Sequence, residues 1–235
     1  MKIADFIKEA EKLNIILTNK QLAQFDSYAK ELIEYNKHTN LTAITNLEDV
    51  YLKHFYDSMT IAKIIDLSNI KNLLDIGSGA GFPGLVIAIL YPNIQITLLD
   101  SNNKKIKFLD YIISKLDLKN VNTIHERAED FSHKNKEKFD VVTSRAVAQL
   151  RILLELSSQC IKIGGVFIAM KADVLEEQKE SITAIKILNF KELNQIQFEL
   201  PYSAGLRNLI KYEKIATVDS KYPRGYDQIK KKPLK

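Results

Sequence analysis

The stretch "LLDIGSGAGFPG", Leu73–Gly84, places four glycines and a proline directly after a short apolar run. A buried strand, a glycine-rich turn and an apolar helix are typical of a parallel α/β sheet, in which ligands bind at the carboxyl ends of the strands. Gly77 and Gly79 leave no side chain between the backbone and such a ligand. A dinucleotide, a phosphate or a sulfonium nucleoside would fit this loop, and a purely structural turn would also explain it.

The pattern after residue 66 supports this fold. Short apolar runs alternate with amphipathic stretches, as in a sheet with helices on both faces. The pattern predicts strands at 72–76, 94–100, 120–124, 139–144, 165–171, 190–200 and 206–216, and helices at 84–91, 104–116 and 150–161. Because only "PYSAG" separates the last two strands, we expect them to form a hairpin.

Residues 1–66 carry helical patterns without strand-like runs. Apolar residues recur at the spacing of amphipathic helices throughout this part of the chain. Thr18 with Gln21, and Thr45 with Glu48, have the spacing of capping boxes, at which a second and a third helix begin.

Positive charge is concentrated at the C-terminus. The formal net charge is +5 and the pI is about 9.0, and the last seventeen residues hold six Lys or Arg residues and two Asp. Such a segment either binds phosphates or is a solvated terminus. We therefore expect three parts, namely an N-terminal helical cap (1–66), the sheet domain (67–218) and a basic C-terminal tail (219–235).

The composition disfavours several classes of protein. Hydrophobic residues make up 46% and charged residues 27% of the chain, as in ordinary soluble domains. We find no signal peptide and no apolar stretch long enough to span a bilayer. The single cysteine, Cys160, lies in an apolar helical pattern, which predicts a buried, reduced thiol in a cytoplasmic protein. We expect no metal site, because the four histidines lack ligand spacing.

The second predicted strand narrows the choice of ligand. It ends in Asp100, and a carboxylate about twenty residues beyond such a loop accepts hydrogen bonds from the ribose of an adenine nucleoside. Pro83 stands at the opening of the next helix, where a pyrophosphate would need an N–H group that proline lacks. This favours S-adenosylmethionine over NAD. The seven strands with a final hairpin also resemble those of class I methyltransferases.

In series, the motifs of the chain resemble the RsmG family, also called glucose-inhibited division protein B. The motifs are "NLTAI", "KHFYDS", "DIGSGAGFPG", "LLDS", "ERAEDF", "TSRAVAQL", "KYPR" and "KKPL". The resemblance implies an α/β, Rossmann-like class I methyltransferase, with a seven-stranded, mostly parallel sheet and an antiparallel C-terminal hairpin after an N-terminal helical region. It implies S-adenosylmethionine as cofactor and guanine N7 of 16S ribosomal RNA as methyl acceptor.

The loop and the resemblance together predict the cofactor-binding residues, which are Gly77, Gly79, Phe82, Asp100, Ala128, Glu129 and Arg145. Asp100 would hold the ribose, and the Ala128–Glu129 pair would lie beside the adenine. Without the resemblance, Glu129 is better explained as an exposed carboxylate at a helix start, and Arg145 as a surface cation.

The chemistry of the acceptor requires no catalytic acid or base. Guanine N7 carries an in-plane lone pair and no hydrogen, so alignment of the two substrates accounts for catalysis. We therefore predict positioning residues only, with Arg145, Lys171 and Arg207 as candidates. The candidates for RNA binding are Lys53, His54, Asp57, Ser58, Lys221 and Arg224. For Lys53 and His54, a solvated helix face is the alternative explanation.

The expected partner is 16S ribosomal RNA, free or within the small ribosomal subunit, and we expect a monomer away from membranes. Three alternatives stay open on the sequence. An NAD-linked oxidoreductase could use the same loop and Asp100. A non-enzymatic RNA-binding module could retain the fold, and a methyltransferase could act on another RNA, a small molecule or a protein.

Overall fold

The computed structural model describes residues 1–145 and 147–234. Within them, seven strands form one sheet in the order β3-β2-β1-β4-β5-β7-β6. These strands are β1 (Asn72–Ile76), β2 (Gln95–Asp100), β3 (Val121–His125), β4 (Phe139–Arg145), β5 (Ile161–Lys171), β6 (Phe190–Glu199) and β7 (Leu206–Lys214). All neighbours pair in parallel except that β7 runs antiparallel to β5 and β6. The predicted fold class is confirmed. Ala146 of the "TSRAVAQL" motif and Lys235 of the predicted tail lie outside the described residues.

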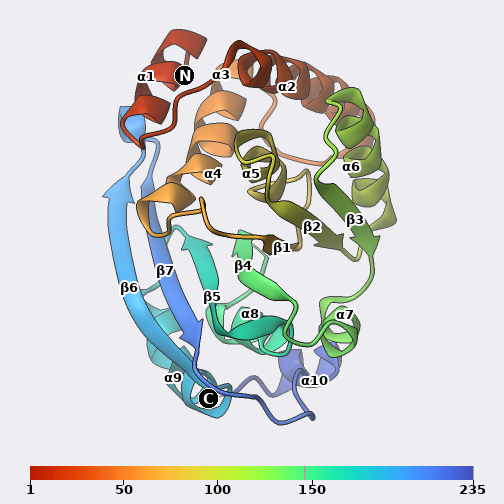
Figure 1. Ribbon diagram of the computed structural model, residues 1–235, viewed down its shortest axis with the longest axis vertical. Helices are drawn as coiled ribbons and strands as arrows, with labels where there is room; N and C mark the ends of the chain where they lie inside the picture. Colours follow the sequence, from red (N-terminus) through yellow and green to blue (C-terminus); the bar gives the residue numbers. More distant parts are fainter. Residues whose placement is uncertain (146, 235) are drawn as a thin grey trace.

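Helices cover both faces of the sheet (Figure 1). α5 (Gly84–Leu90) and α6 (Asn103–Lys115) lie on one face, and α7 (Ala128–Lys134), α8 (Leu150–Ser157) and α9 (Leu175–Ile187) lie on the other. The side chains of β1 alternate between the two faces, because Leu73 packs into one hydrophobic cluster and Leu74 into the second.

The three helices predicted after residue 66 are confirmed, but α7 and α9 were missing from the prediction. The apolar residues of α9 do not all face the core, since Leu175 and Ile182 are 63% and 52% exposed. No single apolar stripe therefore marks this helix in the sequence. Cys160 is buried as expected, yet it lies in the turn after α8 rather than in the helix.

The N-terminal part is helical. It comprises α1 (Ile3–Glu11), α2 (Asn19–Thr39) and a continuous helical segment of α3 (Leu47–Asp49), the π-helical η1 (Val50–Tyr56), α4 (Asp57–Met59) and the 3₁₀-helical η2 (Thr60–Lys63). The capping box of Thr18 and Gln21 is confirmed. The second predicted box is wrong, because Asn46 caps this helix and its side-chain oxygen accepts from two first-turn N–H groups.

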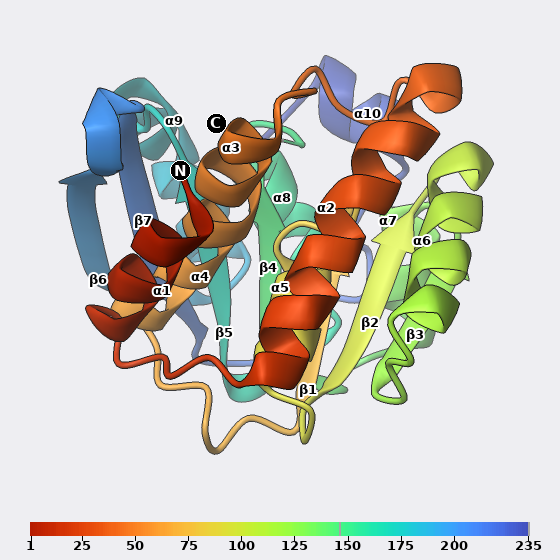
Figure 2. The ribbon, with the colours of Figure 1, turned by 90° about the horizontal axis from the view of Figure 1, so that it is seen from above.

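Aromatic side chains join the N-terminal helices to the sheet. α2 lies beside α5 and α6 (Figure 2). From α2, Tyr28 stacks on Phe82 of the glycine loop with ring centroids 5.5 Å apart, and it also contacts Phe55 at 5.1 Å. These residues share one hydrophobic cluster with α5, α6 and the face of the sheet beneath them. The boundaries near residues 66 and 218 stay predictions.

The basic C-terminal segment is packed against the molecule. It contains a short helix, α10 (Tyr226–Lys231), whose Ile229 is fully buried against Ile152 and Leu156 of α8. The segment is therefore anchored through Ile229, whereas Lys230, Lys231 and Lys232 are exposed to solvent. No helix in the described residues is long and apolar enough to cross a membrane.

Candidate cofactor site

A cavity of about 400 Å³ opens at the carboxyl ends of four neighbouring strands. Its lining residues follow each strand in turn, with Gly77–Ala80 after β1, Asp100 and Ser101 after β2, Glu126–Glu129 after β3, and Arg145 at the end of β4. The volume lies in the range of about 300–1,000 Å³ that is usual for small-molecule sites. The position is the switch point of the sheet, where the chain returns from β3 to β4 beside β1.

The glycine loop forms the floor of this cavity. Gly77 and Gly79 have φ of +71° and +60°, a region that favours glycine. A Cβ on Gly77 would lie 2.5 Å from Val147 Cγ2, whereas one on Gly79 would have only Gly77 O within 4 Å, at 3.9 Å. The Gly77 N–H donates to Leu99 O at 2.7 Å and so fixes the loop to the end of β2. The loop therefore needs glycine at Gly77 for space and at Gly79 for backbone conformation.

Asp100 links the loop to the next helix. Its Oδ2 accepts from Gly79 N at 2.9 Å and its Oδ1 accepts from Asn102 N at 2.9 Å, while Lys105 Nζ lies 3.5 Å from Oδ2. A carboxylate has about four lone-pair positions, so these two hydrogen bonds leave further acceptor capacity on a residue that lines the cavity. This arrangement fits a ribose with two hydroxyl donors.

The start of α5 does not fit a pyrophosphate. Pro83 caps the helix and has no N–H, and the Gly84 N–H donates to Asp75 Oδ2 at 2.9 Å. Asp75 is fully buried, and this burial raises the pKa of its carboxyl to about 7, although Gly84 N–H and Arg145 act in the opposite direction. The donors that a dinucleotide would use are thus absent or occupied.

The opposite wall is supported by a polar cluster from three distant segments, which we call the arginine cluster (His54, Asp57, Arg145 and Arg207). His54 and Arg145 line the cavity, and Asp57 and Arg207 lie outside its lining. Arg145 Nη1 donates to Lys53 O at 3.1 Å and to Asp57 Oδ2 at 3.2 Å. Arg207 Nε, from β7, donates to Asp57 Oδ1 at 3.0 Å. Asp57 therefore pairs with two guanidinium groups at once. Arg145 also lies over the Phe82 ring, 5.1 Å from its centroid.

His54 is a neutral member of this cluster. Burial, followed by the positive charge of Arg145, lowers the pKa of His54 to about 3. Its Nδ1 lies 3.2 Å from Arg145 Nη2 and accepts, so Nε2 donates to Thr42 Oγ1 at 2.9 Å. Its ring stacks on Phe82 with centroids 4.3 Å apart. Both ring nitrogens are therefore engaged.

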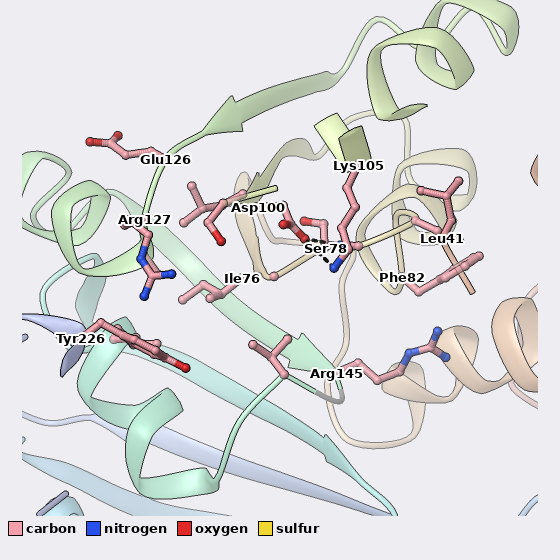
Figure 3. Close-up of a pocket in the computed structure, with 18 of the residues that line it drawn as sticks. Leu41, Ile76, Ser78, Phe82, Asp100, Lys105, Glu126, Arg127, Arg145 and Tyr226 are labelled. Atoms are coloured by element: carbon pink, nitrogen blue, oxygen red, sulfur yellow. Dashed lines mark hydrogen bonds and ion pairs between the residues drawn. The ribbon is translucent and has the colours of Figure 1, made fainter. Parts of the chain in front are cut away.

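All seven residues predicted to bind the cofactor line this one cavity: Gly77, Gly79, Phe82, Asp100, Ala128, Glu129 and Arg145. Figure 3 shows Arg127 and Tyr226 at one end, Phe82 and Arg145 at the other, and Asp100 between them. No cluster of His, Cys, Asp or Glu suited to a metal ion occurs in the described part of the chain.

Two predicted positioning residues lie outside the cavity lining. Lys171 Nζ donates to Ala148 O at 2.5 Å and pairs with Glu177 Oε2 at 2.8 Å. It thereby holds the segment between β4 and α8. Arg207 acts on the cavity through Asp57, the carboxylate that it shares with Arg145.

The predicted RNA-binding residues separate into buried and exposed groups. His54, Asp57 and Ser58 are buried, and Ser58 Oγ donates to His54 O at 2.6 Å. The expectation of direct RNA contact needs correcting for Asp57 and Ser58, because their side chains are used inside the fold.

The other three candidates differ in what they contact. Lys53 is half-buried and pairs with Asp49 at 3.2 Å, whereas Lys221 is exposed and pairs with Asp219 at 3.1 Å. Arg224 instead makes two hydrogen bonds of 2.8 Å to the buried carboxylate of Glu155.

Several lining residues were missing from the prediction, among them Thr42, Lys105, Arg127 and Tyr226. Arg127 directly precedes the predicted Ala128–Glu129 pair, so the rule that ligands bind at strand ends could have found it. Thr42 lies in the "NLTAI" motif. For Tyr226, no periodicity or motif in the basic tail indicates that it reaches the cavity.

Comparison with known proteins identifies the family. The family model described as rRNA small subunit methyltransferase G (GidB) matches residues 21–203. The chain belongs to this family. A ribosomal RNA small subunit methyltransferase G of Acholeplasma laidlawii is 46% identical over 223 residues, covering 94% of this chain and 96% of that protein. One from Staphylococcus carnosus is 42% identical over 238 residues, covering 100% and 99%. The cofactor of this methyltransferase is S-adenosylmethionine.

A solved structure agrees with the fold. The YcgJ protein of Bacillus subtilis superposes with a TM-score of 0.53 at 14% identity, and the match covers 69% of this chain and 100% of that one. At this identity the likeness concerns the fold alone. It agrees with the α/β fold of this chain.

Proposed function

We propose that this chain transfers the methyl group of S-adenosylmethionine to N7 of a guanine in 16S ribosomal RNA, acting as a monomer on the small ribosomal subunit or its RNA. The observation that carries the proposal is membership of the rRNA small subunit methyltransferase G family over nearly the whole chain. The cavity at the strand ends, with Asp100 beside the glycine loop, supports the same assignment.

The residues of the cavity would hold and align the cofactor. When bound, S-adenosylmethionine supplies a methyl group that its sulfonium already activates. Asp100 would accept hydrogen bonds from the ribose, and Gly79 would allow close approach of the backbone. Phe82, packed between His54, Tyr28 and Arg145, would form a rigid wall. Alignment of this kind is worth roughly 7–11 kcal/mol in favourable intramolecular reactions.

Among the described residues, no carboxylate or imidazole that lines the cavity stands ready as a general base. Both nitrogens of His54 are engaged, and Asp100 accepts two backbone N–H groups and would use its remaining acceptor capacity for the ribose. Glu126 pairs with Lys134, and Glu129 pairs with Arg127. A nucleophile that carries a proton would need such a base. Guanine N7 has no proton to lose, so this site suits it better than an exocyclic amine or a ribose hydroxyl.

The first experiment is a methyl-transfer assay with tritiated cofactor. Small ribosomal subunits and deproteinised RNA, both from cells lacking this protein, are offered as acceptors, and the labelled RNA is digested and separated by chromatography. We expect label in 7-methylguanosine with the wild-type chain and a strong loss with Asp100→Ala. Label in a different nucleoside would overturn the acceptor assignment. Absence of label, with cofactor still bound, would overturn ribosomal RNA as the substrate.

A further inference from the structure

The C-terminal segment completes one end of the cofactor cavity. Tyr226, the first residue of α10, is half-buried and lines the cavity together with Leu156 and Ala128. The guanidinium carbon of Arg127 lies 4.2 Å from the centre of the Tyr226 ring. An aromatic face and a planar cation therefore lie together at the end of the cavity that follows β3 (Figure 3).

Tyr226 is held at this position from both sides along the chain. Before it, Arg224 forms a bidentate pair with Glu155 on α8, and His133 Nε2 lies 2.8 Å from Pro223 O. After it, Ile229 is fully buried in a small apolar cluster with residues of α8. Bidentate arginine–carboxylate pairs and buried apolar contacts restrict movement of a short segment. The ring is thus presented to the cavity by a fixed support.

The order of the strands determines which end of the cofactor meets this ring. Asp100, the ribose candidate, follows β2, so adenine would lie on one side of it and the methionine part on the other. On the β1 and β4 side are the backbone of the glycine loop and Arg145, which suit a charged amino-acid group. On the β3 side are Tyr226, Arg127 and Leu156, which suit a flat, uncharged ring.

We infer that Tyr226, supported by Arg127, is a cofactor-positioning residue that forms the wall against the adenine of S-adenosylmethionine, so the C-terminal helix is part of the cofactor site. This inference rests on the assignment of the cavity to S-adenosylmethionine. It gives the tail a role in cofactor binding that is separate from any contact with RNA. Stacking on an aromatic side chain commonly changes the affinity for a base by about tenfold or more.

The test is calorimetric binding of S-adenosylhomocysteine and of methylthioadenosine, which lacks the amino-acid part, to the full chain. We expect Tyr226→Ala to raise both dissociation constants by about tenfold. Tyr226→Phe keeps the ring and should stay within about twofold of the wild type. Tyr202→Ala removes a tyrosine that is 63% exposed and should change nothing. In the methyl-transfer assay, the KM for the cofactor should rise in Tyr226→Ala while kcat at saturation stays near that of the wild type.

Two results would overturn the inference while leaving the cavity assignment intact. One is unchanged affinity in Tyr226→Ala, with both ligands bound normally by the wild type. The other is a loss for S-adenosylhomocysteine alone, which would move the contact of Tyr226 away from the adenine. Failure of the wild-type chain to bind either ligand would overturn the cavity assignment itself, and the role of Tyr226 with it. Unfolding midpoints of the ligand-free variants separate loss of contact from loss of folding.

Discussion

The floor and the walls of the cofactor cavity are held in place by different interactions. In the floor, the backbone N–H of Gly77 donates to Leu99 O of β2. The N–H of Gly79 donates to the carboxylate of Asp100, which is 21 residues away in the chain. The walls depend on ion pairs between distant segments, since Arg145 and Asp57 are 88 residues apart and Arg207 and Asp57 are 150 apart. The floor thus follows from local backbone geometry, whereas the walls form only when the whole chain has folded.

The largest effect on stability is expected at Asp57, the carboxylate that pairs with two arginines. Asp57→Asn removes the carboxylate that pairs with both Arg145 and Arg207, and breaking a buried pair in this way costs about 3 kcal/mol or more. Urea unfolding of the variant measures the loss. Asp26→Asn removes a helix-surface pair with Lys30 and should cost well under about 1 kcal/mol. Equal losses in the two variants would remove the distinction between wall and surface.

A pH series tests the neutral histidine of the same wall. The pKa of His54 is lowered from 6.5 to about 3 in the folded chain, so between these values the unfolded chain binds one more proton. The stability that comes from the neutral ring is complete above pH 6.5 and is lost as the pH falls, by about 2 kcal/mol near pH 5.

The matched variant for this series is His54→Gln, which has no titrating group and should lack this part of the pH dependence. On acidification, the unfolding free energy of the wild type should therefore fall more than that of the variant. A difference that stays constant between pH 5 and pH 7 would contradict a buried neutral His54.

The floor is tested by a pair of glycine substitutions. Gly77→Ala should cost about 1–2 kcal/mol for the positive φ, and more because its Cβ would meet Val147 Cγ2 at 2.5 Å. Gly79→Ala carries a similar backbone cost without such a clash, so its loss should be smaller. Urea unfolding ranks the two variants. A larger loss in Gly79→Ala than in Gly77→Ala would mean that the Val147 side chain moves to accommodate the added methyl group.

The smallest effect on stability is expected at the surface of the tail. Lys221 is exposed and pairs with exposed Asp219, so Lys221→Ala should leave the unfolding free energy nearly unchanged. If it contacts a phosphate, the slope of log affinity for RNA against log salt should fall by about one. Filter binding at several salt concentrations measures this slope. Lys12→Ala, directly after α1, is the control and should keep the wild-type slope.

The sequence indicates the residues of the floor more directly than those that support the walls. Gly77, Gly79 and Asp100 carry their own signals, because a positive φ needs glycine and a strand-end carboxylate marks a nucleoside site. The sequence does not show that Asp57 and Ser58 are buried, because their burial depends on which elements pack over them. They were therefore expected to contact RNA. Tyr226 carried no signal, because its position follows from the pairing of Arg224 with Glu155, 69 residues away.

The sequence by itself determined the order of the seven strands, the helices α5, α6 and α8, the glycine loop and the family of this chain, since these depend on residue type and on spacing along the backbone. Only the tertiary structure decided that Asp57 bridges Arg145 and Arg207, and that the tail closes one end of the cavity. The physical reason is that buried ion pairs and aromatic contacts form between surfaces brought together by packing. The spacing of residues along the chain does not specify which of these surfaces will meet.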